Sequence, residues 1–109
     1  MSKPTDLVQG TLDLLILKVI APEPMHGWAI AKRIRQTSND VLLVGQSALY
    51  MALHKLEQQG WIEAEWKLSE NNRRAKYYAL TRAGRHALAK ETHQWERLSA
   101  AISLIVGKA

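Results

Sequence analysis

Residues 45–62 place polar side chains at the spacing of one helical face. Leu49, Leu53 and Leu56 recur at i, i+4 and i+7, which predicts a helix with one apolar stripe. The opposite face, with Lys55 at its edge, collects hydrogen-bonding groups and one aromatic ring: Ser47, Tyr50, Met51, His54 and Gln58. Side chains of this reach suit the edges of nucleic-acid bases. An ordinary amphipathic helix with a solvated polar face has the same pattern, so the surrounding chain must decide.

The positive charge of the chain is concentrated in one segment. The 109 residues carry a formal net charge of +5. Between positions 67 and 90, Glu70 is the single acidic residue among seven basic ones: Lys67, Arg73, Arg74, Lys76, Arg82, Arg85 and Lys90. A basic stripe confined to one stretch is typical of proteins that bind a polyanion, although a basic solvated surface gives the same count.

Length and composition indicate one domain without a cysteine framework. A chain of 109 residues is long enough for one hydrophobic core but not for two. The absence of cysteine excludes disulfides and thiolate metal sites and fits a reducing compartment. Because we find neither a signal-peptide pattern nor an apolar run of membrane length, we expect a soluble cytoplasmic protein without a membrane partner.

Recognisable catalytic and cofactor-binding motifs are missing from the sequence. His26, His54, His86 and His93 have no cysteine or paired carboxylate at metal-ligand spacing, so we expect no metal and no cofactor. A Gly-rich phosphate loop, a nucleophile elbow and an acid–base pair are also missing. The sequence therefore does not indicate an enzyme.

Two further helices are expected before the polar-faced one. A first helix is predicted over Leu7–Ala21 and ends at Pro22 and Pro24; it is apolar over nearly its whole circumference. Such a helix must be covered on more than one side, by its own domain and by a second subunit. A second helix is predicted over about Trp28–Gln36, with an inward side formed by Trp28, Ile30, Ala31 and Ile34. Residues 41–44 are interpreted as a short strand or a buried loop.

After Gly60 the apolar period changes from 3.6 to 2, which predicts a β-hairpin. The first strand alternates Ile62, Ala64, Trp66 and Leu68 with charged residues. A polar loop over residues 69–75 and a second strand over 76–80 follow, with Arg73 and Arg74 near the tip. Three helices followed by a hairpin with a basic tip form a winged helix-turn-helix, whose third helix enters the major groove of DNA.

A long final helix is predicted over Arg82–Val106, with Thr81 as its N-cap. Its apolar residues approach the spacing of a coiled-coil seam: Leu88, Trp95, Leu98, Ile102 and Ile105. We expect a homodimer built on this seam together with Leu12 and Ile16 of the first helix. The fold class is thus mostly α with a small β-hairpin. Residues 1–80 form the winged helix-turn-helix domain and residues 81–109 a C-terminal dimerisation helix.

These motifs, in this order and spacing, resemble the PadR-type transcriptional regulators in their short form with one C-terminal helix. The resemblance covers nearly the whole chain and rests on four segments and a tryptophan in the final helix: GTLDLLILKVI at 10–20, HGWAIAKRI at 26–34, SALYMALHKLEQQGWI at 47–62 and RRAKYYALTRAG at 73–84. It implies a homodimeric, usually repressing regulator that binds double-stranded DNA. A two-fold dimer of such a module implies a pseudo-palindromic operator.

The resemblance also assigns roles to single positions. Leu49 belongs to the core, whereas the DNA contacts are Gln46, Ser47, Tyr50, His54 and Lys55 on the third helix and Arg73, Arg74 and Lys76 on the wing. Met51 stands where the family commonly has proline, which alters the base contacts at that point, and Trp28 stands where tyrosine is commoner.

Two questions remain open at the level of sequence. Trp95 matches a position at which some family members stack flat aromatic ligands, which would make a small molecule the effector; a tryptophan at seam spacing usually packs the dimer instead. The whole chain is either a DNA-binding repressor or a winged-helix protein-interaction module without specific DNA binding. Basic and hydrogen-bonding residues on the third helix and the wing favour DNA.

Overall fold

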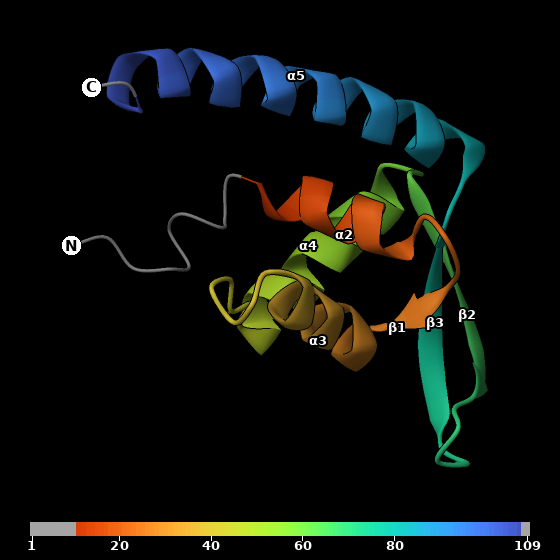
Figure 1. The fold of residues 1–109 in the computed structure, drawn as a ribbon. Coiled ribbons are helices and arrows are strands. Elements are labelled where there is room, and N and C mark those ends of the chain that lie inside the picture. Colours follow the sequence, from red (N-terminus) through yellow and green to blue (C-terminus); the bar gives the residue numbers. More distant parts are fainter. Residues whose placement is uncertain (1–10, 108–109) are drawn as a thin grey trace.

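The computed structural model describes residues 11–107, in which helices pack against a small antiparallel sheet (Figure 1). In chain order the elements are α2 (Leu12–Ile20), β1 (Met25–His26), α3 (Gly27–Thr37), α4 (Gln46–Gln58), β2 (Ile62–Leu68), β3 (Arg74–Leu80) and α5 (Arg82–Val106). The predicted order of three helices, a hairpin and a long helix is therefore confirmed. Residues 7–10 of the predicted first helix fall outside the described part of the chain.

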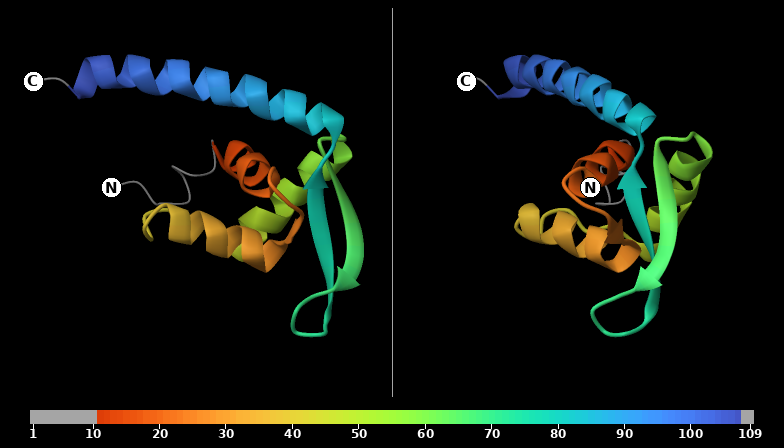
Figure 2. Two further views of the ribbon diagram at one scale, coloured as in Figure 1. Left: turned by 45° about the vertical axis from the view of Figure 1, so that its right-hand side comes forward. Right: turned by 90° about the vertical axis from the view of Figure 1, so that its right-hand side faces the viewer.

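The core forms where α2, α3 and α4 meet the base of the sheet (Figure 2). Its most completely buried side chains come from all three helices and from the first residue of β2: Ile16, Leu17, Ile20, Ile30, Leu49, Leu53, Leu56 and Ile62. The leucine stripe of α4 thus faces inward, as its spacing predicts. The opposite face of α4 is left to solvent.

Helix α2 is covered by elements of its own chain. Leu12 and Ile16 are 4% and 0% exposed and belong to the same cluster as the residues of α3 and α4. In this conformation the two side chains leave no surface for a second subunit, and we do not include them in the dimer surface proposed below. Helix α2 packs against α3, α4 and α5 of its own chain, whereas Leu14, Leu15 and Val19 on the rest of its circumference are half-buried.

The sheet has the order β1-β3-β2, with β2 and β3 paired from Ile62↔Leu80 to Leu68↔Arg74. Tyr78 and Leu80 are buried on one face, as the alternation predicts. The edge strand β1 was not predicted, because two residues are too few to show an alternating pattern. It pairs with β3 through Met25↔Tyr78 and so joins the start of α3 to the hairpin.

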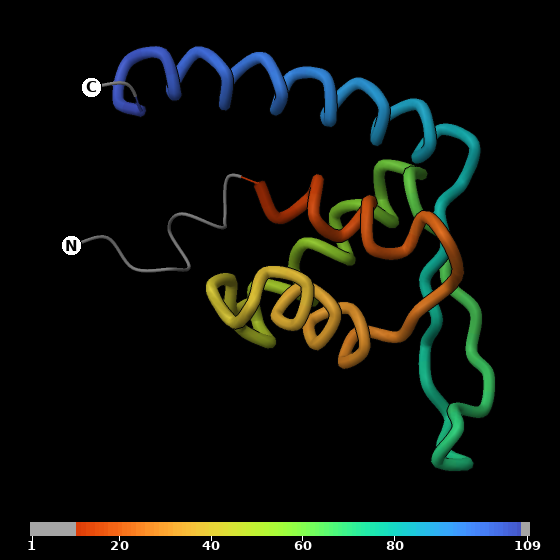
Figure 3. The backbone as a smooth tube through the Cα atoms, viewed as in Figure 1, coloured from red at the N-terminus to blue at the C-terminus, as the bar shows by residue number. Residues whose placement is uncertain are grey.

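The outer half of the hairpin extends beyond the helices (Figures 1 and 3). Trp66 and Leu68 continue the inward alternation but are 57% and 63% exposed, because no helix lies over this part of the sheet. The second strand begins at Arg74 rather than Lys76. A tight turn, in which the Ser69 N–H donates to the Arg73 carbonyl at 2.7 Å, shortens the predicted loop.

One other sequence-based assignment was wrong in detail, and one open alternative was decided in favour of a loop that is only half buried. Trp28, predicted on the inward side of the second helix, is 66% exposed, whereas Ile30 and Ile34 fill that side. Residues 41–44 form a loop without strand pairing: Val41 and Leu43 are exposed, and the other two side chains pack against the core. A helical wheel defines a face only to within one neighbouring position, and Trp28 sits at that margin.

The predicted capping residues are found at the end of α4 and at the start of α5. Gly60 adopts a φ of +79° after α4, a conformation that favours glycine. The Thr81 hydroxyl accepts from the Gly84 N–H at 3.0 Å and donates to the Gly60 carbonyl at 2.6 Å. One N-cap therefore links the start of α5 to the end of α4. His26 caps α3 in a similar way, since its Nδ1 accepts from the Ala29 N–H at 3.3 Å.

Candidate nucleic-acid interface

The outer face of α4 presents the predicted base-reading side chains to solvent. All of the residues assigned to this face from the sequence are exposed: Gln46, Ser47, Tyr50, Met51, His54, Lys55 and Gln58. Gly45 is the N-cap of α4 and has no side chain to occupy the first backbone N–H groups. The helix therefore presents a polar face to solvent, and no N-cap side chain covers its N-terminal end.

Tyr50 is held at the crossing of α4 and α3. Its ring lies over Gly27, where an added Cβ would come within 2.5 Å of the Tyr50 Oη and 2.8 Å of its Cζ. Only glycine allows this approach, so the first residue of α3 sets the position of the tyrosine. The side chain is still 43% exposed. Tyr50 is thus both placed by the fold and available to a partner.

Two of the predicted cationic contacts are already paired within the chain. The Lys55 Nζ lies 2.7 Å from the Asp13 Oδ2 on α2, and the Lys76 Nζ lies 3.4 Å from the Glu57 Oε1 on α4. These pairs are partly exposed, so each contributes little to stability, but each lowers the positive charge that its lysine offers to a phosphate. Asp13 and Glu57 were not identified from the sequence, because both pairs join separate elements.

The contact between α4 and β3 also affects the pKa of Tyr78. Burial raises the pKa of this phenol, and the nearby Glu57 carboxylate and Tyr50 raise it further. The Lys76 Nζ lies 5.7 Å from the centroid of the Tyr78 ring. The lysine therefore bridges the helix and the hairpin, which makes it a positioning residue for the wing.

Of the four cationic contacts predicted on α4 and the hairpin, the two without an ion pair among the described residues lie at the far end of the hairpin. Arg73 is in the turn and Arg74 begins β3; both are exposed, and neither forms a salt bridge with any residue between 11 and 107. The Arg74 guanidinium lies 5.4 Å from the centroid of the Trp66 ring, within the range of a cation–π contact. Among the predicted cationic contacts, these two arginines are therefore the ones whose charge is not already neutralised within the chain.

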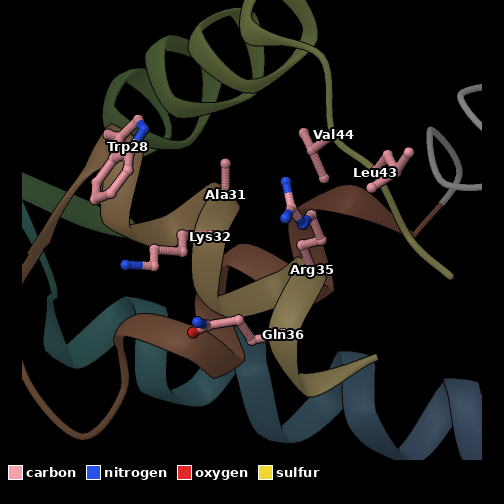
Figure 4. Close-up of a pocket in the computed structure, with 7 residues that line it drawn as sticks. All are labelled: Trp28, Ala31, Lys32, Arg35, Gln36, Leu43 and Val44. Atoms are coloured by element: carbon pink, nitrogen blue, oxygen red, sulfur yellow. The ribbon is translucent and has the colours of Figure 1, made fainter. Parts of the chain in front are cut away.

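A shallow groove runs along the exposed side of α3 (Figure 4). It has a volume of about 390 Å³, and its lining comes from α3 and from the loop before α4: Trp28, Ala31, Lys32, Arg35, Gln36, Leu43 and Val44. The Lys32 Nζ lies 4.8 Å from the centroid of the Trp28 ring, and the Arg35 Nε lies 3.1 Å from the Asp40 Oδ1. The exposed Trp28 therefore forms the wall of a groove instead of filling the core.

Trp95 lies on α5 beside the N-terminal end of α2. It is 43% exposed and lines a hollow of about 230 Å³ with Thr11, Asp13, Leu14, Glu91, Gln94 and Leu98. Farther along the same helix Leu98, Ile102 and Ile105 are 53%, 46% and 82% exposed. Leu88, by contrast, packs against the core of its own chain. The apolar surface of α5 therefore begins at Trp95 and continues toward the C-terminal end.

The part of the chain that the structure describes contains neither a group of three potential metal ligands nor a helix suited to crossing a membrane.

Comparison with known proteins identifies the family. The sequence model of the transcriptional regulator PadR-like family matches residues 16–90. The uncharacterized protein X of Lysinibacillus sphaericus is 26% identical over 102 residues, which cover 94% of each chain. A transcriptional regulator from Clostridium thermocellum superposes with a TM-score of 0.83 at 27% identity, covering 93% of this chain and 98% of that one. A PadR family transcriptional regulator from Eggerthella lenta superposes at 0.79 with 27% identity, covering 95% and 88%. The family model and the two solved structures are of transcriptional regulators rather than enzymes, and the chain belongs to the PadR-like family of transcriptional regulators.

Proposed function

We propose that the protein is a homodimeric repressor that binds a pseudo-palindromic operator. In each subunit α4 enters the major groove, where Gln46, Ser47, Tyr50, Met51 and His54 contact base edges. Arg73 and Arg74 of the hairpin neutralise phosphates and fix the register on the duplex. The observation that carries this proposal is the combination of an exposed polar α4 face with two unpaired arginines on the adjoining hairpin.

The dimer is proposed from the exposed apolar side of α5. Trp95, Leu98, Ile102 and Ile105 lie on a 25-residue helix that runs past the body of the domain (Figure 2). Exposed apolar patches of this kind mark interaction surfaces, and a second copy of α5 offers the same residues. A two-fold axis between the helices would place two α4 helices on one face of DNA, which requires two half-sites in inverted orientation.

The lysine pairs argue for specific rather than general attraction to DNA. Lys55 and Lys76 are held by Asp13 and Glu57, so two of the four predicted cationic contacts are partly neutralised within the chain. Affinity for random duplex is then modest, because it depends on phosphate neutralisation. The alternative is a protein-interaction module, which would not bind operator DNA more tightly than random DNA.

Trp95 has two candidate roles within this proposal. In the first it packs the dimer seam, which its place next to Leu98 supports. In the second it stacks a small flat aromatic ligand that releases the repressor, which the hollow beside its half-exposed ring supports. Titration with flat cationic dyes separates the two: a ligand site changes tryptophan emission and weakens operator binding in the wild type. A Trp95→Phe variant loses both responses, whereas a purely packing tryptophan shows neither.

The proposal is tested by fluorescence anisotropy of the full chain on DNA from upstream of its own coding region, with a scrambled duplex as control. Tighter binding to the native duplex with a stoichiometry of two chains per duplex is the expected result. Equal binding to native, scrambled and selected random duplexes would refute sequence-specific recognition. Absence of binding at low salt would favour the protein-interaction module.

A further inference from the structure

The inward face of the hairpin carries an exposed apolar patch beyond the core. Trp66 pairs with Lys76 and Leu68 pairs with Arg74. Because paired residues of two antiparallel strands lie on the same face, all four side chains lie on the face where Ile62 is buried. At the base this face belongs to the core; at the outer half its two large apolar side chains are 57% and 63% exposed. We call Trp66, Leu68 and Arg74 the overhang; these side chains are exposed and do not belong to the hydrophobic core.

The overhang adjoins the polar face of α4. Lys76 lies on the same face of the hairpin and reaches the Glu57 carboxylate of α4 at 3.4 Å. Figures 1 and 3 show the hairpin descending past α4 and ending in a free tip. A partner lying against α4 and the tip at the same time would therefore pass along Trp66 and Leu68.

The two faces of the hairpin differ in charge. The overhang face carries Arg74 and Lys76 and no acidic residue from the hairpin strands. The opposite face carries the exposed carboxylates of Glu63 and Glu65 together with one cation, Lys67, whose Nζ lies 4.8 Å from the centroid of the Tyr77 ring. A partner of the overhang is thus anionic with apolar surface between its charges. Duplex DNA has this chemistry, since deoxyribose C–H groups alternate with phosphates along the groove edge.

Trp66 also orients the guanidinium beside it. The Arg74 Cζ lies 5.4 Å from the Trp66 ring centroid, and an arginine on an aromatic face loses little freedom when it binds a phosphate. Arg73, one residue earlier in the turn, has no aromatic contact within the described chain. The two arginines of the tip are therefore not equivalent.

We propose that Trp66 and Leu68 pack against the deoxyribose wall of the groove next to the one that α4 enters, and that Trp66 positions Arg74 on the adjoining phosphate. The contact is independent of base sequence, because sugars and phosphates are common to all sites. This inference rests on the proposed DNA-binding function and adds an apolar contact to a wing that is otherwise described by its charge.

The test measures affinity for operator and random duplexes across a salt series with Trp66→Ala, Leu68→Ala, Arg74→Ala and the double variant Trp66→Ala with Arg74→Ala. We expect each apolar variant to weaken both duplexes by a similar factor, about fivefold. Leu68→Ala should leave the salt slope unchanged, because it releases no counterion. The fold-loss of DNA affinity in the double variant should be smaller than the product of the two single fold-losses, since each single substitution already removes the Trp66–Arg74 contact. The matched control Glu65→Gln, on the opposite face, should not weaken binding.

Acrylamide quenching gives a second readout. Bound DNA should protect tryptophan emission in the wild type and protect it less in Trp66→Phe. If wild type binds DNA and Arg73→Ala with Arg74→Ala weakens it, but Trp66→Ala and Leu68→Ala bind like wild type, the inference is wrong and the overhang serves another partner. If wild type itself fails to bind DNA, the proposed function fails first, and the two failures are distinguishable.

Discussion

Replacing Gly27 with alanine should displace Tyr50 while leaving the fold intact. The new Cβ would come within 2.5 Å of the Tyr50 Oη, 2.8 Å of Cζ and 3.0 Å of Cε1. Carbon and oxygen atoms in contact are normally separated by about 3.4 Å or more, so the ring end has to move by roughly 1 Å. The tyrosine tip is the end of a flexible, half-exposed side chain, which can turn toward solvent at small cost.

The expected effects of Gly27→Ala on stability and on operator affinity follow from the contacts that are lost in the free protein and in the DNA complex. Position 27 is the first residue of α3 and has a helical conformation, so alanine is tolerated by the backbone and the free energy of unfolding should change by less than about 0.5 kcal/mol. In the complex a displaced Tyr50 loses a side-chain contact worth about 1.4 kcal/mol, or tenfold in affinity for the operator. Affinity for random duplex should fall much less.

Thermal unfolding and anisotropy on operator and random duplexes measure the two effects separately. Gly84→Ala is the informative control, because its Cβ would overlap the backbone carbonyl of Trp61 and therefore destabilises the fold itself. In a Tyr50→Ala background Gly27→Ala should have no further effect on binding. Wild-type operator affinity in Gly27→Ala, or a loss of stability as large as that of Gly84→Ala, would show that Gly27 does not act by positioning Tyr50 for DNA.

Three further outcomes are expected. Burial raises the folded-state pKa of Tyr78, so its contribution to stability is complete below the ordinary tyrosine pKa of about 10 and is lost as the pH rises through the folded pKa. In denaturant titrations above about pH 10, Tyr78→Phe should therefore lose less stability than wild type, and equal losses would contradict this. Glu57→Gln frees Lys76 and removes a negative charge beside α4, so affinity for any duplex should rise about twofold at low salt with a steeper salt slope; unchanged binding would show that the pair does not limit the wing. Leu98→Glu with Ile102→Glu should give the mass of one chain in light scattering, with the fold retained by circular dichroism, whereas a persistent dimer would exclude this face of α5 as the interface.

Local patterns were sufficient to predict most of the fold. The i, i+4, i+7 spacing of Leu49, Leu53 and Leu56 identified the buried side of α4 and hence its exposed side. Thr81 and Gly60 identified a helix start and a helix end because caps depend on residues close in sequence. These signals act over a few residues, so they can be interpreted without knowledge of the tertiary structure.

What could not be predicted depends on distant parts of the chain. Alternation in β2 assigns Trp66 to the inward side but says nothing about where the core ends, so its exposure was missed. The Lys55–Asp13 pair joins helices more than forty residues apart in sequence, and the Gly27–Tyr50 contact depends on how α3 crosses α4. The candidate site was thus predicted as a set of residues, whereas the charge actually free to bind DNA required the structure.

In the proposed complex α4 recognises the base sequence and the hairpin binds phosphates, and two sets of variants separate these roles. Tyr50→Ala and the double variant Arg73→Ala with Arg74→Ala are titrated against operator and random duplexes over a salt series. We expect the arginine variant to weaken binding to both duplexes alike and to lower the salt slope by about two, whereas Tyr50→Ala should mainly reduce the preference for operator over random DNA. Equal losses on both duplexes for both variants, with equal salt slopes, would contradict this expectation.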